Sequence, residues 1–205
     1  MKVNEIFYSL QGEGYYSGTP AVFLRLSGCN LRCPFCDTQH EHGTPMAEAE
    51  IVEAVKRYPA KHVVITGGEP ALQLTATLVD AFHAAGRYVA VETNGTRPLP
   101  ANVDWVTLSP KSAFVDGADV VLTRADEIKV VYDGIHDPAT QLSPLAPQGR
   151  RPQFTFHLSP YLFLQPCDTG DAARNAEIIR AAIEYIKKDP RWRLSLQIHK
   201  ILDIK

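Results

Sequence analysis

Short apolar runs that end in polar, glycine or proline residues recur along this chain of 205 residues. We expect these runs to form strands, because turn-forming residues bound each of them. They cover residues 3–9, 21–26, 62–66, 88–92, 104–108, 127–131, 161–165 and 194–199. The run Val63-Val64-Ile65 is continuously apolar, which is typical of a parallel strand buried on both faces. The pattern therefore predicts an α/β protein with a parallel sheet.

Helical patterns are fewer than strand patterns. Thr44 and Pro45 are expected to begin a helix, because threonine favours the N-cap and proline the first helical position. Further helices are expected around Leu78 and, as a long element, around Ile179, while the proline-rich residues 138–153 are expected to form a surface loop. Eight complete βα units would need more helices. We predict one domain over residues 1–205, a partial, open β/α barrel of about six parallel strands.

The composition excludes some partners. A net charge of −2 gives no reason to expect binding to nucleic acid or to a membrane surface. No apolar run approaches the ~20 residues of a membrane-spanning helix. The first residues lack the apolar segment of a secretion signal, so we expect a cytoplasmic protein with reduced thiols.

Three of the four cysteines lie together. Cys29, Cys33 and Cys36 have the spacing C-x3-C-x2-C on a loop that follows a predicted strand, while Cys167 is far away in the sequence. Three thiolates leave a metal centre one protein ligand short. The residues alone allow an iron–sulfur cluster with one open iron, or a Cys3His zinc site completed by His40 in a zinc-stabilised binding module.

Further candidate site residues follow other strands. The Gly-Gly-Glu-Pro sequence at residues 67–70 follows one strand, and Glu92 with Asn94 ends the next. Arg25 is a charged residue inside an apolar strand just before the cysteines, so it pairs either with a ligand carboxylate or with an internal one. Because active sites of parallel barrels lie at the C-terminal ends of the strands, we expect these groups to share one site.

These motifs resemble those of the radical S-adenosylmethionine (SAM) superfamily, in the three cysteines with Phe35 before the last and in residues 67–70. More specifically, the chain resembles the 7-carboxy-7-deazaguanine synthases over residues 7–14, 25–38, 66–70, 92–96, 109–111 and 197–200. The resemblance implies a lyase that converts 6-carboxy-5,6,7,8-tetrahydropterin to 7-carboxy-7-deazaguanine with loss of ammonia, in queuosine or other deazapurine biosynthesis. The glycyl-radical activating enzymes, which act on a protein partner, are the alternative within the superfamily.

The resemblance also implies cofactors, partners and residue roles. It implies a [4Fe–4S] cluster, SAM, Mg2+, a homodimer, and an electron donor such as flavodoxin or ferredoxin. The cluster ligands would be Cys29, Cys33 and Cys36, and the magnesium ligand Thr38. Residues toward SAM would be Phe35, Asp37, Gly68, Ser109, Pro110, Lys111, Gln165, Pro166, Cys167 and Asp168. Residues toward the pterin would be Leu10, Gln11, Gly12, Arg25, Thr66, Glu92, Asn94, His199 and Lys205. The family tends to end in a proline whose carboxylate reaches the substrate, whereas Lys205 stands last here.

Overall fold

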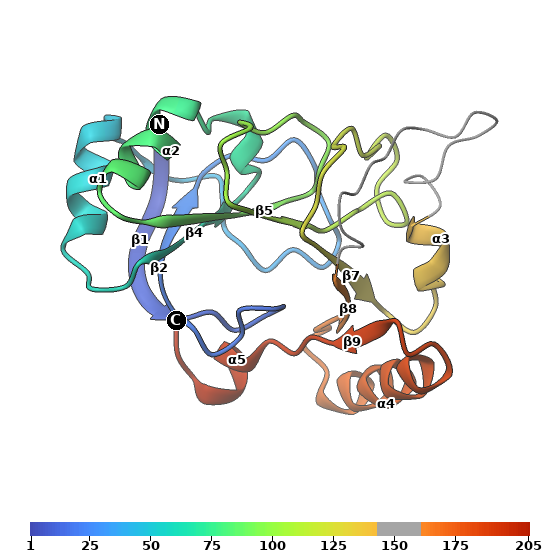
Figure 1. Ribbon diagram of the computed structural model, residues 1–205. Helices are drawn as coiled ribbons and strands as arrows, with labels where there is room; N and C mark the ends of the chain where they lie inside the picture. Colours follow the sequence, from blue (N-terminus) through green and yellow to red (C-terminus); the bar gives the residue numbers. More distant parts are fainter. Residues whose placement is uncertain (143–160) are drawn as a thin grey trace.

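The computed structural model describes residues 1–142 and 161–205, and the strands in this part of the chain form one curved sheet (Figure 1). Their order in the sheet is β3-β1-β2-β4-β5-β6-β7-β8-β9. The bounds are β1 Lys2–Leu10, β2 Pro20–Leu26, β3 Thr44–Pro45, β4 His62–Gly67, β5 Tyr88–Thr93, β6 Trp105–Leu108, β7 Glu127–Tyr132, β8 Tyr161–Pro166 and β9 Trp192–Leu194.

The sheet is mostly parallel and open. Parallel pairing joins neighbouring strands from β2 through β4 to β9, while β1 pairs antiparallel with β2 and β3 antiparallel with β1. β3 and β9 are the two edges, so the sheet does not close on itself. The predicted open barrel with few helices is therefore confirmed, and all C-terminal ends of the parallel strands lie on one side.

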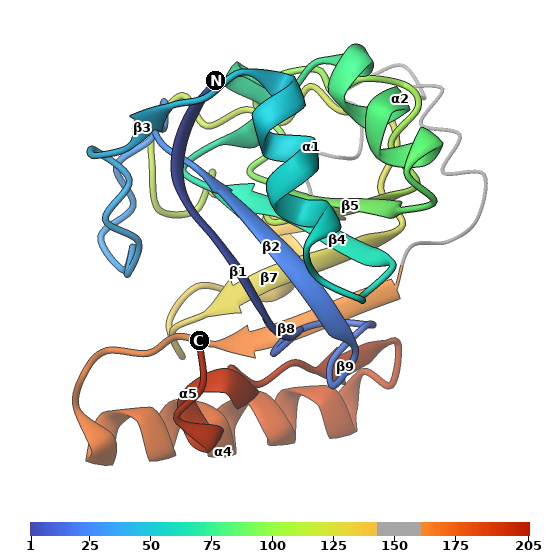
Figure 2. The same ribbon diagram turned by 90° about the vertical axis from the view of Figure 1, so that its left-hand side faces the viewer.

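The described helices are few, and the longer ones cover the outer face of the curved sheet. They are α1 Glu48–Lys56, the 3₁₀ helix η1 Pro70–Leu72, α2 Ala76–Ala84, α3 Pro138–Leu142, α4 Ala172–Lys188 and α5 Ile198–Leu202. Figure 2 shows α1 and α2 next to each other over β4 and β5, and α4 beside β8 and β9. The main core, which includes Leu24, Ile65, Phe82 and Leu164, lies between these helices and the sheet. No described helix is long and apolar enough to cross a membrane.

The prediction that Thr44 and Pro45 begin a helix is wrong. These two residues form β3, which pairs with Lys2 and Val3 of β1. The helix begins at Glu48 instead, where the carboxylate of Glu50 accepts a hydrogen bond from the backbone N–H of Ala47 at 2.7 Å. Glu50 in the first turn thus supplies the cap of this helix. Thr44 and Pro45, which the sequence pattern assigned to the helix start, pair instead with the edge of β1.

Two further boundaries differ from the prediction. The strand expected over residues 194–199 is wrong in both bounds, because β9 covers Trp192–Leu194 and His199 lies on α5. The chain leaves the sheet because the N–H of Ile198 donates to the carbonyl oxygen of Gly12 at 3.0 Å rather than to a strand. In the predicted loop 138–153, Pro138–Leu142 form α3, and the rest of that loop lies outside the described residues.

Candidate functional site

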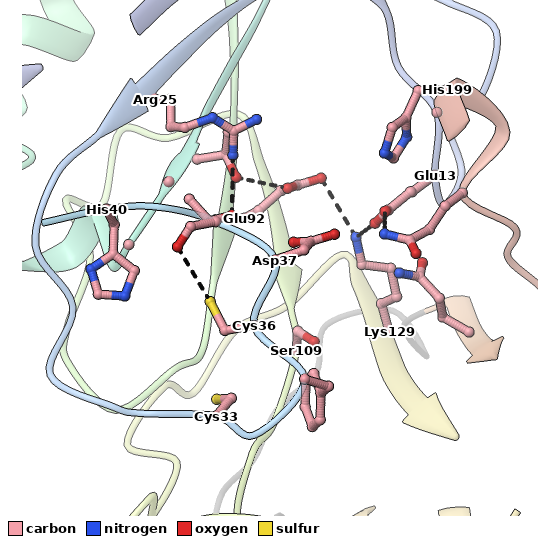
Figure 3. Close-up of a pocket in the computed structure, with 18 of the residues that line it drawn as sticks. Glu13, Arg25, Cys33, Cys36, Asp37, His40, Glu92, Ser109, Lys129 and His199 are labelled. Carbon is pink, nitrogen blue, oxygen red and sulfur yellow. Dashed lines mark hydrogen bonds and ion pairs between the residues drawn. The ribbon is translucent and has the colours of Figure 1, made fainter. Parts of the chain in front are cut away.

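A cavity of about 520 Å³ lies at the C-terminal ends of the parallel strands. It brings together the residues that the sequence suggested for the cluster, for SAM and for the substrate, with one exception. Pro110 is buried beside the cavity and does not line it. Segments from both ends of the chain contribute, and Figure 3 shows Glu13 from the loop after β1 and His199 from α5.

The three clustered cysteines lie on the loop that follows β2. Cys29 and Cys33 are half-buried and Cys36 is exposed, and burial raises the pKa of the first two thiols. The loop is closed at its base, because the N–H of Gly28 donates to the carbonyl oxygen of His40 at 2.7 Å, and the side-chain amide of Asn4 on β1 ties it to the sheet by donating to the carbonyl oxygen of Gln39 at 2.9 Å. All three cysteines therefore face the same cavity from one anchored loop.

The glycines after β4 lie directly on the cysteine loop. A Cβ atom at Gly68 would come within 1.9 Å of the carbonyl oxygen of Gly28, so only glycine fits this position. The N–H of Glu69 donates to the same carbonyl oxygen at 2.8 Å. The second motif of the sequence is thus in backbone contact with the residue that precedes Cys29.

Glu69 is fully buried and connects this turn to β5. Its carboxylate accepts hydrogen bonds from the hydroxyl of Thr93 and the backbone N–H of Asn94, both at 2.7 Å, and from the N–H of Ala71 at 2.9 Å. Burial raises the pKa of Glu69, and the three donors favour its charged form. Glu69 therefore shapes the cavity wall without lining the cavity.

A network of charged groups forms the opposite wall. The carboxylate of Glu92 accepts from the hydroxyl of Thr66 at 2.9 Å and from the amide of Gln11 at 3.2 Å. The ammonium of Lys129 lies 3.6 Å from Glu92 and forms an ion pair with Glu13 (Figure 3). Although burial opposes the charged form of Glu13, the Lys129 ammonium lowers its pKa to about 2.

Sequence reasoning missed Glu13 and Lys129. Lys129 is a charged residue inside the apolar strand β7, which is the same pattern that drew attention to Arg25. Glu13 lies in the turn-rich loop after β1, where a glutamate is unremarkable. Its pairing with a lysine 116 residues away depends on the fold.

Arg25 lies in the cavity wall next to the cysteine loop. Its Nε atom donates to Glu5 at 2.9 Å, and its Nη1 atom donates to the hydroxyl of Thr38 at 3.4 Å. Among the described residues, Nη2 has no hydrogen-bond partner. The internal ion pair is present, and one edge of the guanidinium remains for a ligand, so pairing with a substrate carboxylate stays a prediction.

The C-terminal segment closes one side of the cavity. The ammonium of Lys200 on α5 lies 2.8 Å from Asp37 on the cysteine loop and 2.8 Å from Asp168 after β8. The hydrogen bond from Lys200 lowers the pKa of Asp168. Lys205 pairs with Glu5 at 2.5 Å, and His199 packs against Gly12, where a Cβ atom would come within 2.4 Å of its ring.

The remaining residues suggested for SAM, apart from Pro110, also line the cavity. The ammonium of Lys111 donates to the carbonyl oxygen of Ser109 at 3.0 Å and lies 5.8 Å from the centre of the Phe35 ring. Burial lowers the pKa of Lys111 to about 8. Gln165, Pro166 and Cys167 line the cavity as β8 ends.

The donor set fits an iron–sulfur cluster better than a single metal ion. Within residues 1–142 and 161–205, no three His, Cys, Asp or Glu side chains are arranged to hold one ion. Thiolates around a four-iron cluster bind different irons, so they need not converge on one point. Three cysteines on one loop, next to a cavity lined with polar groups, suit a cluster whose fourth iron binds a ligand from that cavity.

The model of the radical SAM superfamily matches residues 24–192, which include the cysteine loop and most of the parallel sheet. This match and the open parallel sheet define the class, an enzyme that binds a [4Fe–4S] cluster and SAM and needs a reductant. The zinc-stabilised binding module is therefore excluded.

Comparison with individual proteins narrows the class. The chain is 50% identical to 7-carboxy-7-deazaguanine synthase of Bacteroides thetaiotaomicron, with 100% of this chain and 98% of that protein covered. It is 40% identical to the enzyme of the same name from Burkholderia multivorans, with 98% of each chain covered. The crystal structure of QueE from Escherichia coli superposes with a TM-score of 0.71 at 30% identity, covering 95% of this chain and 92% of that one. The chain belongs to the 7-carboxy-7-deazaguanine synthase family of the radical SAM superfamily.

Proposed function

We propose that this chain converts 6-carboxy-5,6,7,8-tetrahydropterin to 7-carboxy-7-deazaguanine and ammonia. The atoms of the two products equal those of the substrate, so the conversion is a rearrangement with elimination and needs no net oxidant. The observation that carries the proposal is the cavity in which the cysteine loop faces a wall of polar groups from β1, β4 and β5. Full-length identity of 50% to a relative with that name supports it.

The residues of the chain would bind and orient the substrate. When bound, the cluster and SAM supply a carbon radical that removes one hydrogen atom from the substrate. Glu92 and Asn94 would accept and donate hydrogen bonds at the edge of the flat ring, and Arg25 would pair with the carboxylate. Positioning is the main contribution of the protein, because a reactive radical must meet a single hydrogen atom.

We propose that Mg2+ binds only together with the substrate, which supplies some of its ligands. Thr38 offers one hydroxyl oxygen, and that oxygen already accepts from Arg25. Mg2+ requires about six oxygen ligands, so Thr38 does not form a magnesium site by itself. We assign no step to the ion. If substrate and water complete the site, Thr38→Ala should lower turnover and weaken its dependence on Mg2+ while the cluster still assembles.

The assembly and the setting are also proposals. We propose a homodimer that accepts electrons from a flavodoxin or ferredoxin in the cytoplasm, on the basis of the family resemblance. The arrangement in one domain over residues 1–205 is supported by the single sheet that the described strands form.

Anaerobic reconstitution tests the proposed function. The chain should bind about four irons and four sulfides, and with SAM and a reductant it should release equal amounts of 7-carboxy-7-deazaguanine and ammonia. Cys33→Ser should lose the cluster, whereas Cys167→Ser should retain it, because Cys167 lies outside the cysteine loop. Turnover that requires a protein partner would favour the glycyl-radical activating alternative.

A further inference from the structure

Lys129 is a buried cation in the cavity wall. Its side chain is 7% exposed, and its ammonium lies between the carboxylates of Glu13 and Glu92 (Figure 3). Although burial opposes its charged form, the carboxylates of Glu13, Glu92 and Glu127 raise the pKa of Lys129. The carboxylates of Glu13 and Glu92 therefore hold Lys129 as a cation at the cavity.

We propose that Lys129 is a positioning residue that holds Glu92 as an oriented carboxylate, so that Glu92 accepts hydrogen bonds from the N–H edge of a flat heterocycle. The inference rests on the proposed function, because it assigns the pterin to the cavity. It adds a residue that acts on the substrate through another side chain.

The contacts of Glu92 leave room for a ligand. Oε2 accepts from Thr66 at 2.9 Å, and Oε1 accepts from Gln11 at 3.2 Å with Lys129 at 3.6 Å. An ionised carboxylate has about four acceptor positions, so these three contacts leave at least one for an N–H group of a ligand. Glu92 lines the cavity and its side chain is 24% exposed, so a ligand in the cavity can reach the carboxylate.

A cation next to Glu92 fixes the direction of its carboxylate. The ammonium of Lys129 lies 3.6 Å from Oε1, the oxygen that also accepts from Gln11. An ionised carboxylate only accepts hydrogen bonds, and an ammonium only donates them. The pair with Lys129 therefore presents Glu92 as an acceptor toward the N–H edge of a ligand.

Glu13 fixes Lys129 from the other side. One oxygen of Glu13 contacts Lys129, and the other accepts from the amide of Gln197 at 3.1 Å. Glu13 thus anchors the ammonium to the segment before α5, and Lys129 in turn anchors Glu92 on β5. Because Glu13 acts on Glu92 through Lys129, we expect the loss of the Glu13 charge to weaken substrate binding less than the loss of the Lys129 charge does.

The test is a double-mutant cycle on the reconstituted full chain. Lys129→Met should raise the KM for 6-carboxytetrahydropterin by about tenfold or more, with iron content and substrate-free SAM cleavage as in the wild type. In a Glu92→Gln background the same change should raise KM by less than about threefold, because coupled residues are not additive. Lys187→Met is the matched control, an exposed lysine on α4 that should leave KM unchanged.

The outcomes separate the inference from the proposed function. An unchanged KM for Lys129→Met, or a full additional loss in the Glu92→Gln background, would overturn the inference. Glu13→Gln keeps Lys129 charged and should raise KM by less than about threefold. A large loss in that variant would also overturn the inference, and this arm holds even where Lys129→Met fails to fold. A wild-type chain that leaves the pterin unchanged overturns both proposals.

Discussion

Glu69 shows how a single buried residue shapes the site without touching a ligand. Its carboxylate joins the turn after β4 to the end of β5 through donors from Ala71, Thr93 and Asn94. The same turn is packed on the cysteine loop through Gly68. One side chain therefore sets the distance between the cluster motif and the wall that carries Glu92.

Glu69→Gln should destabilise the protein. The amide replaces one acceptor oxygen by an NH2 group that faces a donor in a buried position, at a cost of about 1–3 kcal/mol in the free energy of unfolding. Urea unfolding of the cluster-free chain measures this cost. Glu53→Gln on α1, where the side chain is 67% exposed, should change stability by less than about 0.5 kcal/mol. Equal stability of the two variants would contradict the assigned role.

Replacing Arg25 tests whether its guanidinium binds the substrate or serves only the internal ion pair. Arg25→Ala should raise the KM for the pterin at least about tenfold, because a charge-assisted hydrogen bond is lost. Iron content and substrate-free SAM cleavage should persist. Glu5→Gln, which removes the internal partner but keeps the guanidinium, is the matched comparison. If Arg25→Ala lowers the free energy of unfolding and leaves KM unchanged, Arg25 serves only the internal ion pair.

Among the elements, α5 has the largest effect on the site for its size. This helix of five residues supplies His199 and Lys200, and Lys200 links Asp37 of the cysteine loop to Asp168 after β8. The helix is exposed and short, so these ion pairs and the bond from Ile198 to Gly12 hold it in place. Both aspartates belong to the set that the resemblance assigns to SAM.

Lys200→Met should loosen this side of the cavity. The expected result is a rise of about threefold to tenfold in the KM for SAM, since partly exposed ion pairs contribute about 1 kcal/mol each at most. Limited proteolysis should also cleave the chain near α5 faster than in the wild type. Lys187→Met is again the control on α4. Unchanged SAM kinetics with unchanged proteolysis would show that α5 does not depend on Lys200.

At the scale of the elements, the sequence predicted the presence of strands and helices better than the residues at which they begin and end. Apolar runs identified the strands of the parallel sheet from β2 to β8, because burial on both faces demands continuous apolar residues, whereas the run predicted for the last strand shares only Leu194 with β9. The predicted start of α1 was wrong because Thr44 and Pro45 pair with the free edge of β1. The predicted end of the last strand was wrong because the N–H of Ile198 donates to the carbonyl oxygen of Gly12. The motifs located the cavity, whereas the Glu13–Lys129 pair depends on contacts between distant segments that no local pattern records.

The whole molecule has a main core that runs the length of the sheet. Residues from Val3 on β1 to Trp192 on β9 belong to one continuous group of packed apolar side chains. Trp105 begins β6 and packs against a second, smaller group on the sheet. The two tryptophans therefore report on separate parts of the same sheet.

The cluster-free chain should unfold in a single transition. Because the main core is continuous, variants that retain only Trp105 or only Trp192 should give the same urea midpoint by fluorescence, and circular dichroism should agree. The variants Trp192→Phe and Trp105→Phe provide the two reporters. Midpoints that differ by more than the error of the fit would divide the chain into two cooperative units and contradict a single domain.

The order of strands in the sheet matters during synthesis on the ribosome. From β1 to β9 each strand lies beside one made earlier, and β3 adds to the outer edge of β1. A growing chain therefore finds every partner strand already present, so the sheet can be built in the order of translation. The cavity has a different requirement, because Glu5 pairs with Lys205 and Asp37 pairs with Lys200. A nascent chain acquires its sheet first and its binding site last.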